Sequence, residues 1–158
     1  MMISRLRPGA VVVPWDFSKE AEQELETAFD LVDDLSMIRV VHVAPSDTSG
    51  AAMAGETVYS TIRRDLNSKF QQQISERFAC PEVNFYVVHG RVAPEIVAFA
   101  QQYQAGLIVM GTREHWAVAR LLRGSTTSEV LHTAPCPILI LRHNRSAEYS
   151  QLRSLSAR

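Results

Sequence analysis

Two short segments carry the residue types that bind a phosphorylated ligand. The first, GTREHWAVARLLRGST, runs from Gly111 to Thr126 and joins an apolar run to a helix that Ser125 or Thr126 begins. A helix N-terminus presents unpaired N–H groups and a partial positive charge, which both suit a phosphate, and the two hydroxyls would add donors. A local alternative stays open, because Thr126 and Glu129 have the spacing of a capping box that would use the same N–H groups.

The second segment, PWDFS at positions 14–18, places Asp16 directly after another apolar run. A carboxylate at this place can accept hydrogen bonds from a ribose or from the edge of a base. It can equally accept the backbone N–H groups of the turn that precedes the next helix. The residues alone leave both roles open.

Motifs that assemble a catalytic centre are absent from the sequence, which has no G-x-S-x-G elbow, no H-E-x-x-H pair and no Walker lysine. His42 occupies an alternating position inside an apolar run, so we expect it to be packed rather than to join Asp16 and Ser18 in a triad. Cys80 and Cys136 lie outside any Cys/His cluster, which predicts reduced thiols and no metal site. We therefore expect no enzyme, with a slow ATPase as the remaining catalytic alternative.

The composition is that of an ordinary globular protein. The chain has 158 residues, of which 46% are hydrophobic and 21% charged, and its net charge is −1. This balance gives no general attraction to nucleic acid or to a membrane surface, so we expect neither as a partner. The first apolar run, which Pro14 ends, is too short for a signal sequence or a membrane span, and this favours a cytoplasmic protein.

Apolar runs alternate with helical patterns along the chain. We expect strands over residues 10–13, 38–43, 83–88, 107–110 and 138–141. We expect helices to begin after Ser18, at Val58, near Pro94 and at Ser125 or Thr126. Residues 44–57 are small and polar without a period, which predicts a loop.

Strands that are apolar on both faces and alternate with helices predict a parallel sheet covered on both sides. The fold class is therefore α/β, a three-layer, doubly wound, five-stranded sheet. We place one domain over residues 1–143 and a flexible C-terminal tail over residues 144–158. In such a sheet, ligands bind beyond the carboxyl ends of the strands, where the strand order switches. Both candidate segments lie at such ends.

Several stretches resemble the universal stress protein family. They are VVVPWDFSKEAEQELETA, VVHVAP, GLIVMGT and GSTTSEVLHTAPCPILIL, and the resemblance covers roughly residues 8–142. It implies a Rossmann-like fold of the adenine nucleotide alpha-hydrolase-like type with strand order 3-2-1-4-5. It also implies a homodimer that pairs through the last strand, where an apolar edge invites association. The protein partner that such a dimer would serve is not named by the sequence.

Members of that family either bind ATP through a G-x2-G-x9-G-[ST] pattern or lack the pattern and bind none. Gly111 takes the first place here, and Gly124 with Ser125 takes the last, but the second glycine is replaced by Glu114. The resemblance implies an ATP site, with Mg²⁺ as a further component, made by Pro14, Asp16, Val41, Met110, Gly111, Arg113, Glu114, Gly124, Ser125 and Thr126. The alternative is a member that has lost nucleotide binding and acts only through dimerisation and protein contacts.

The size and the charge of Glu114 bear on the choice between these alternatives. A glycine lets the backbone approach a phosphate closely, whereas a glutamate adds a Cβ and a negative charge. Arg113, Arg120 and Arg123 are near in sequence and could either offset this charge or pair with it and close the site. A third role for Glu114 is to hold a divalent ion beside the phosphates.

We predict that Glu114→Gly strengthens ATP binding by about 1–2 kcal/mol, the size of one partly screened repulsion plus relief of backbone restriction. Titration calorimetry of both forms against ATP and magnesium measures the change. Weaker binding by the glycine form would instead make Glu114 a ligand or a metal anchor. An absence of binding by both forms would favour the member that has lost its nucleotide.

Overall fold

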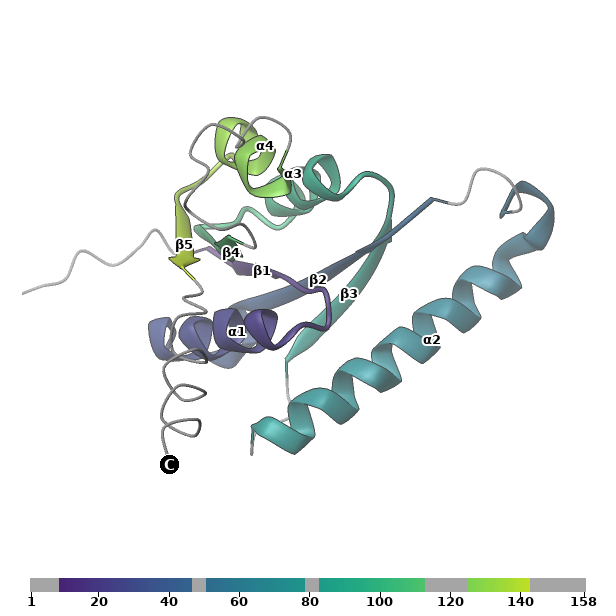
Figure 1. Cartoon of the computed structure of the whole chain (residues 1–158), viewed down its shortest axis with the longest axis horizontal. Coiled ribbons are helices and arrows are strands. Elements are labelled where there is room, and N and C mark those ends of the chain that lie inside the picture. Colours follow the sequence, from purple (N-terminus) through teal and green to yellow (C-terminus); the bar gives the residue numbers. More distant parts are fainter. Residues whose placement is uncertain (1–8, 47–50, 79–82, 113–124, 143–158) are drawn as a thin grey trace, which may run out of the picture.

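The computed structural model describes residues 9–46, 51–78, 83–112 and 125–142, with the side chains of the second range described from Val58 onward. Its centre is a five-stranded sheet in the order β3-β2-β1-β4-β5, and all neighbouring strands are parallel (Figure 1). The strands are β1 (Val11–Pro14), β2 (Ile38–Ala44), β3 (Asn84–His89), β4 (Leu107–Thr112) and β5 (Ile138–Arg142). The expected fold class and strand order are confirmed.

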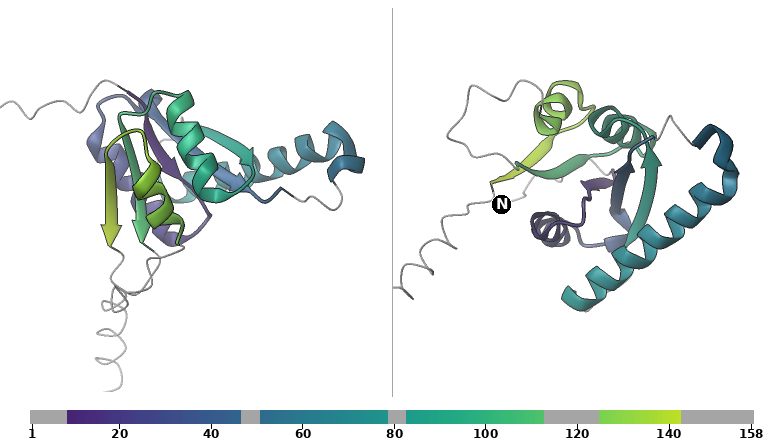
Figure 2. Two further views of the ribbon diagram at one scale, coloured as in Figure 1. Left: turned by 90° about the horizontal axis from the view of Figure 1, so that it is seen from above. Right: turned by 45° about the vertical axis from the view of Figure 1, so that its right-hand side comes forward.

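Helices cover both faces of this sheet. They are α1 (Lys19–Leu31), α2 (Ala51–Arg77), α3 (Val92–Gln102) and α4 (Thr126–Thr133), with a short 3-10 turn, η1 (Leu35–Met37), before β2. Figure 2 shows α1 and α2 on one side of the sheet and α3 and α4 on the other. In the described ranges, no helix has the combination of length and hydropathy needed to cross a membrane.

The pleat of β1 explains why its residues are apolar without interruption. Val11 and Val13 belong to a core cluster with Leu25 of α1 and Phe70 of α2. Val12 points the other way, into a second cluster built largely from α3. Alternate side chains of one strand thus enter two cores, which is the arrangement that a central parallel strand requires.

The pairing of the strands leaves a gap between the ends of β1 and β4. β1 pairs with β2 along its whole length, up to Pro14 opposite Val41. Its pairing with β4 stops earlier, at Val12 opposite Ile108. The ends of β1 and β4 therefore separate at the point where the chain order switches from one half of the sheet to the other, which is where such folds bind ligands.

One expectation about the fold is wrong. Residues 44–57 were expected to form a loop, but α2 already begins at Ala51. The segment has no apolar period to reveal a helix, yet alanine has the highest intrinsic helix propensity, and three alanines fall within its first four helical residues. The proposed tail over residues 144–158 lies outside the described residues, as does Cys80, and both stay predictions.

The apolar stripe of α2 is only partly buried. Phe70 and Ile74 are almost fully enclosed, whereas Val58 and Ile62 are 43% and 39% exposed. No side chain between Val58 and Lys69 is buried. A helix of 27 residues is about 40 Å long, about twice the length of a six-residue strand, so its first half extends past the sheet (Figure 1).

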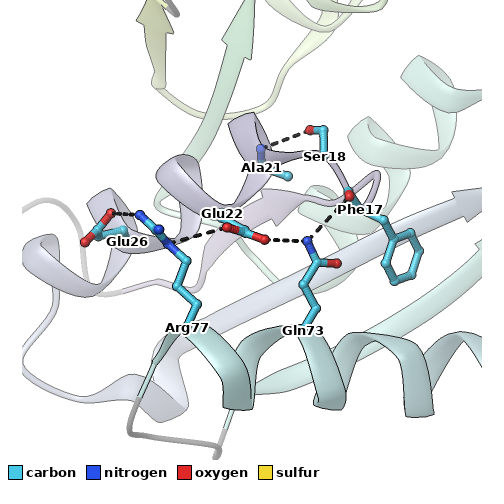
Figure 3. A network of polar contacts seen from close by, with 7 residues as sticks. All are labelled: Phe17, Ser18, Ala21, Glu22, Glu26, Gln73 and Arg77. Carbon is cyan, nitrogen blue, oxygen red and sulfur yellow. Dashed lines mark hydrogen bonds and ion pairs between the residues drawn. The ribbon is translucent and has the colours of Figure 1, made fainter.

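A polar network fastens the packed end of α2 to α1 (Figure 3). Gln73 Nε2 donates to Glu22 Oε1 at 2.6 Å and to the carbonyl oxygen of Phe17 at 3.4 Å. Arg77 binds Glu22 Oε2 at 3.5 Å and Glu26 Oε2 at 3.1 Å. The network reaches the turn after β1, so α2 helps to hold the loop that carries Asp16.

The uneven burial of α2 generates a matched test. Ile74→Ala should lower the free energy of unfolding by about 2–5 kcal/mol, because it removes a buried side chain and leaves a cavity. Ile62→Ala makes the same chemical change three helical turns earlier, at an exposed position, and should cost less than about 1 kcal/mol. Urea denaturation of both variants measures the difference. Equal losses would mean that the first half of α2 is packed in solution.

Candidate functional site

A cavity of about 500 Å³ opens at the carboxyl ends of β1, β2 and β4, beside the gap between β1 and β4. Its walls also include the starts of α1, α3 and α4. Every predicted site residue that the structure describes lines it: Pro14, Asp16, Val41, Met110, Gly111, Ser125 and Thr126. Arg113, Glu114 and Gly124 lie outside the described residues. The volume falls in the range of small-molecule and cofactor sites.

Asp16 organises the turn that leads from β1 into α1. Its Oδ1 accepts hydrogen bonds from the backbone N–H of Ser18 at 2.9 Å and from the Ser18 hydroxyl. Ser18 Oγ in turn accepts the N–H of Ala21 and caps α1, as expected from the sequence. The local role considered for Asp16 is therefore present, and Asp16 also faces the cavity.

Phe17, inside this turn, has a φ of 65°. Bulky residues seldom adopt this left-handed conformation, because the Cβ is crowded by the backbone. The contacts around Phe17 hold it there: Gln73 binds its carbonyl oxygen, and its ring packs edge-on against Trp15 and His42. The turn that presents Asp16 is thus fixed from the α2 side.

The start of α4 differs from the expected capping box. Ser125 is the N-cap, and its Oγ accepts the N–H of Ser128 at 3.1 Å. Thr126 is the first helical residue, so it cannot form a box with Glu129, which instead binds Arg91 at 3.2 Å. Ser125 is thus the N-cap of the two candidates expected from the sequence, and the capping box considered as an alternative is not formed. The hydroxyl of Thr127 donates to the carbonyl oxygen of Gly111 at 3.1 Å and so ties α4 to the end of β4.

His42 and Val41 form the β2 side of the cavity. The Nδ1 of His42 lies 2.8 Å from the carbonyl oxygen of Trp15, and the Trp15 N–H donates to the carbonyl oxygen of Val41 at 2.8 Å. These two hydrogen bonds continue the link between β1 and β2 beyond the last paired residue. His42 is packed and bound to the backbone, as expected, and the side chain of Val41 is fully buried.

Glu24 is the residue that sequence reasoning missed. It lies on α1, lines the cavity and is only 7% exposed. The pKa of its carboxyl is raised to about 8, mainly by burial; a backbone hydrogen bond from Gly111 opposes this rise, and the negative charge of Glu20 adds to it. A helical wheel could have found it, because Glu24 follows Ala21 by three residues and adjoins Leu25 on the buried stripe of α1.

The described cavity wall is acidic and rich in hydroxyls. Asp16, Glu20 and Glu24 contribute carboxyls, Ser18 and residues 125–127 contribute hydroxyls, and no lysine or arginine of the described ranges lines it. Among the described residues there is also no group of three His, Cys, Asp or Glu side chains placed to hold a metal ion. The arrangement suits a polar organic ligand that is held by hydrogen bonds to hydroxyl and carboxyl groups.

The sequence of this chain is similar to those of several known proteins. A universal stress protein of Methanocaldococcus jannaschii is 27% identical over 138 residues, which cover 84% of this chain and 81% of that protein. A universal stress protein of Thermus aquaticus is 42% identical over 130 residues, covering 73% of this chain and 95% of the relative.

Solved structures share the fold at lower sequence identity. The hypothetical protein MJ0577 superposes with a TM-score of 0.65 at 19% identity, over 87% of this chain and 97% of its own. A universal stress protein in complex with cAMP gives a TM-score of 0.53 at 19% identity, over 84% of this chain and 95% of its own.

The family model described as "Universal stress protein family" matches residues 9–142, from just before β1 to the last residue of β5. The match includes all five strands and both segments that line the cavity. This chain belongs to the universal stress protein family.

Proposed function

We propose that this chain is a nucleotide-binding regulatory protein of the stress response, and that it binds ATP weakly in the cavity beside β1 and β4. The observation that carries the proposal is the convergence of Asp16, Val41, Gly111 and Ser125 on one cavity of about 500 Å³. A structural neighbour in the same family was solved with cAMP, an adenine nucleotide. The absence of a transmembrane helix among the described residues agrees with our further proposal of a cytoplasmic protein.

Different residues of the cavity would bind the nucleoside and the phosphates of ATP. Asp16 would accept hydrogen bonds from ribose hydroxyls, and the base would meet the backbone of β2 at Val41. Gly111, Ser125 and Thr126 would hold phosphate at the end of β4 and the start of α4, where backbone N–H groups and the helix dipole favour an anion. Magnesium would enter with the nucleotide, bound to its phosphates.

Catalysis has less support than binding. His42 uses Nδ1 on the carbonyl oxygen of Trp15, and Ser18 is engaged by Asp16 and by the N-terminus of α1. The Ser18 hydroxyl donates to Asp16 Oδ1, but the same oxygen accepts the N–H of Ser18 and Ser18 Oγ accepts the N–H of Ala21, so these contacts build the turn before α1. We therefore propose a binding protein rather than an enzyme.

A second candidate function is a family member that binds no nucleotide and acts through protein contacts alone. The acidic wall favours it, because the described lining contains three carboxyl groups and no cation. Mass spectrometry of the protein purified without added nucleotide distinguishes the two. Co-purified ATP or another adenine nucleotide supports the first candidate, and its absence together with no heat of ATP binding in calorimetry supports the second.

We also propose that the protein is a homodimer joined through β5. This strand lies at the edge of the sheet, and its apolar residues Ile138 to Leu141 are all half-buried in the single chain. Pairing with a second copy would satisfy the free edge and cover these side chains.

For ATP binding, Asp16→Ala should weaken affinity by about 1–3 kcal/mol, as expected for the loss of a charged hydrogen bond. Asp34→Ala is the matched control, because Asp34 accepts the N–H of Ser36 just as Asp16 accepts that of Ser18, but outside the cavity. The control should keep the affinity of the wild type in titration calorimetry. An unchanged affinity for Asp16→Ala, with ATP still bound, would remove Asp16 from the site.

For the dimer, Ile140→Lys should shift the molecular mass in light scattering toward that of a monomer, because it would place a charged side chain on each copy in an apolar interface. Ile62→Lys makes the same change at an exposed position on α2, on the opposite side of the molecule from β5 (Figure 1), and should leave the mass unchanged. A wild-type protein that is monomeric at micromolar concentration would refute the proposal.

A further inference from the structure

Phe17 lies in the turn beside the cavity but does not line it. Its neighbours Trp15, Asp16 and Ser18 all do. The Phe17 ring packs instead against the core cluster that α1 and α2 share, where it meets the ring of Phe85 edge-on. Phe17 is thus the residue of this turn that contacts the body of the protein while its neighbours face the ligand site.

Two side chains of α2 hold Phe17 in place. Lys69 Nζ lies 4.3 Å from the centre of the Phe17 ring, which is a cation–π contact. Gln73, one helical turn further along α2, donates from Nε2 to the carbonyl oxygen of Phe17 at 3.4 Å (Figure 3). One contact binds the side chain of Phe17 and the other its backbone, so both depend on where α2 lies.

These contacts hold a backbone conformation that phenylalanine rarely adopts. The φ of Phe17 is 65°, in the left-handed region where the backbone crowds the Cβ. Without its contacts, a phenylalanine favours a negative φ, which would redirect the chain on both sides of it. Asp16 Oδ1 accepts the N–H and the hydroxyl of Ser18 across Phe17, so the whole turn would change. The placement of Asp16 in the cavity therefore depends on α2.

We propose that Phe17 couples ligand binding in the cavity to the packing of α2, as a positioning residue that directs Asp16 toward the ligand while α2 holds it. The inference rests on the proposed nucleotide binding and extends it to regulation. Ligand contacts with Asp16 and α2 contacts with Phe17 stabilise the same conformation of the turn, so each strengthens the other. Nucleotide occupancy thus changes the local stability of α2.

Phe17→Ala and Phe17→Gly separate the ring from the backbone conformation. Alanine removes the ring and keeps the crowded Cβ, so the turn should relax and ATP affinity should fall about 2- to 30-fold in titration calorimetry. Glycine also removes the ring but adopts a positive φ readily, so it should recover most of the affinity that alanine loses. A residue that served only as core packing would give the opposite order, because glycine removes more side chain and adds flexibility.

Gln73→Met tests the α2 side and leaves the turn and the aromatic core unchanged, so it also decides the matter if the Phe17 variants do not fold. Methionine has a similar length but cannot donate a hydrogen bond, and ATP affinity should fall at least about twofold. Gln72→Met is the matched control, since Gln72 is exposed and its amide donates to Glu76 of the same helix. It should keep the affinity of the wild type.

Hydrogen exchange measures α2 directly. In the wild type, saturating ATP should slow the exchange of the amides of residues 69–77 by the same factor, about 2- to 30-fold, because the coupling is reciprocal. The amides of residues 58–66 belong to the unpacked part of α2 and should not respond. In Phe17→Gly the turn keeps its conformation without help from α2, so the slowing over residues 69–77 should be largely lost.

The outcomes separate the coupling from nucleotide binding. Affinity that is highest in the wild type, lower in Phe17→Gly and lowest in Phe17→Ala, with slowing over residues 69–77 in the wild type, supports the coupling. Equal affinities, lower affinity in glycine than in alanine, or slowing that persists in Phe17→Gly overturn it and leave nucleotide binding intact. An absence of ATP binding by the wild type overturns the proposed function itself, and with it the coupling.

Discussion

The early end of pairing between β1 and β4 is the constraint on which the rest of the site depends. Val12 is the last residue of β1 paired with β4, whereas pairing with β2 continues to Pro14. Two backbone hydrogen bonds then prolong the link to β2, through Trp15 and His42. The chain is thereby held to one side of the sheet, and the space left on the other side is the cavity that Asp16, Glu24 and Gly111 share.

The same constraint explains the chemical character of Glu24. The helix that follows β1 packs against β4, and its buried stripe passes below the open gap. Taking an ionised carboxylate out of water costs several kcal/mol, so burial raises the pKa of the Glu24 carboxyl. A backbone hydrogen bond from Gly111 offsets only part of this effect.

Periodicity made the architecture predictable, because each strand contains a short apolar run and most of the helices show an apolar repeat of their own. What periodicity could not show was the start of α2, where alanines favour a helix without marking a face. The sequence left the cap of α4 open between Ser125 and Thr126, since both are good caps and only the backbone decides between them. Glu24 escaped notice because glutamate is rarely buried and is normally assigned to the exposed face of a helix.

The length of α2 means that one helix spans two regimes of local stability. Its last turns are held by Phe70, Ile74 and the contacts of Gln73 and Arg77, whereas no side chain from Val58 to Lys69 is buried. This segment has few tertiary contacts, among them the Tyr59 ring against His89 and Lys69 over the Phe17 ring, so it relies more on its own backbone hydrogen bonds, which open at a small cost in free energy. Fluctuations that unravel α2 would therefore start at its overhanging end and stop near Phe70, so the helix would protect its amides from solvent exchange in a gradient rather than as one unit.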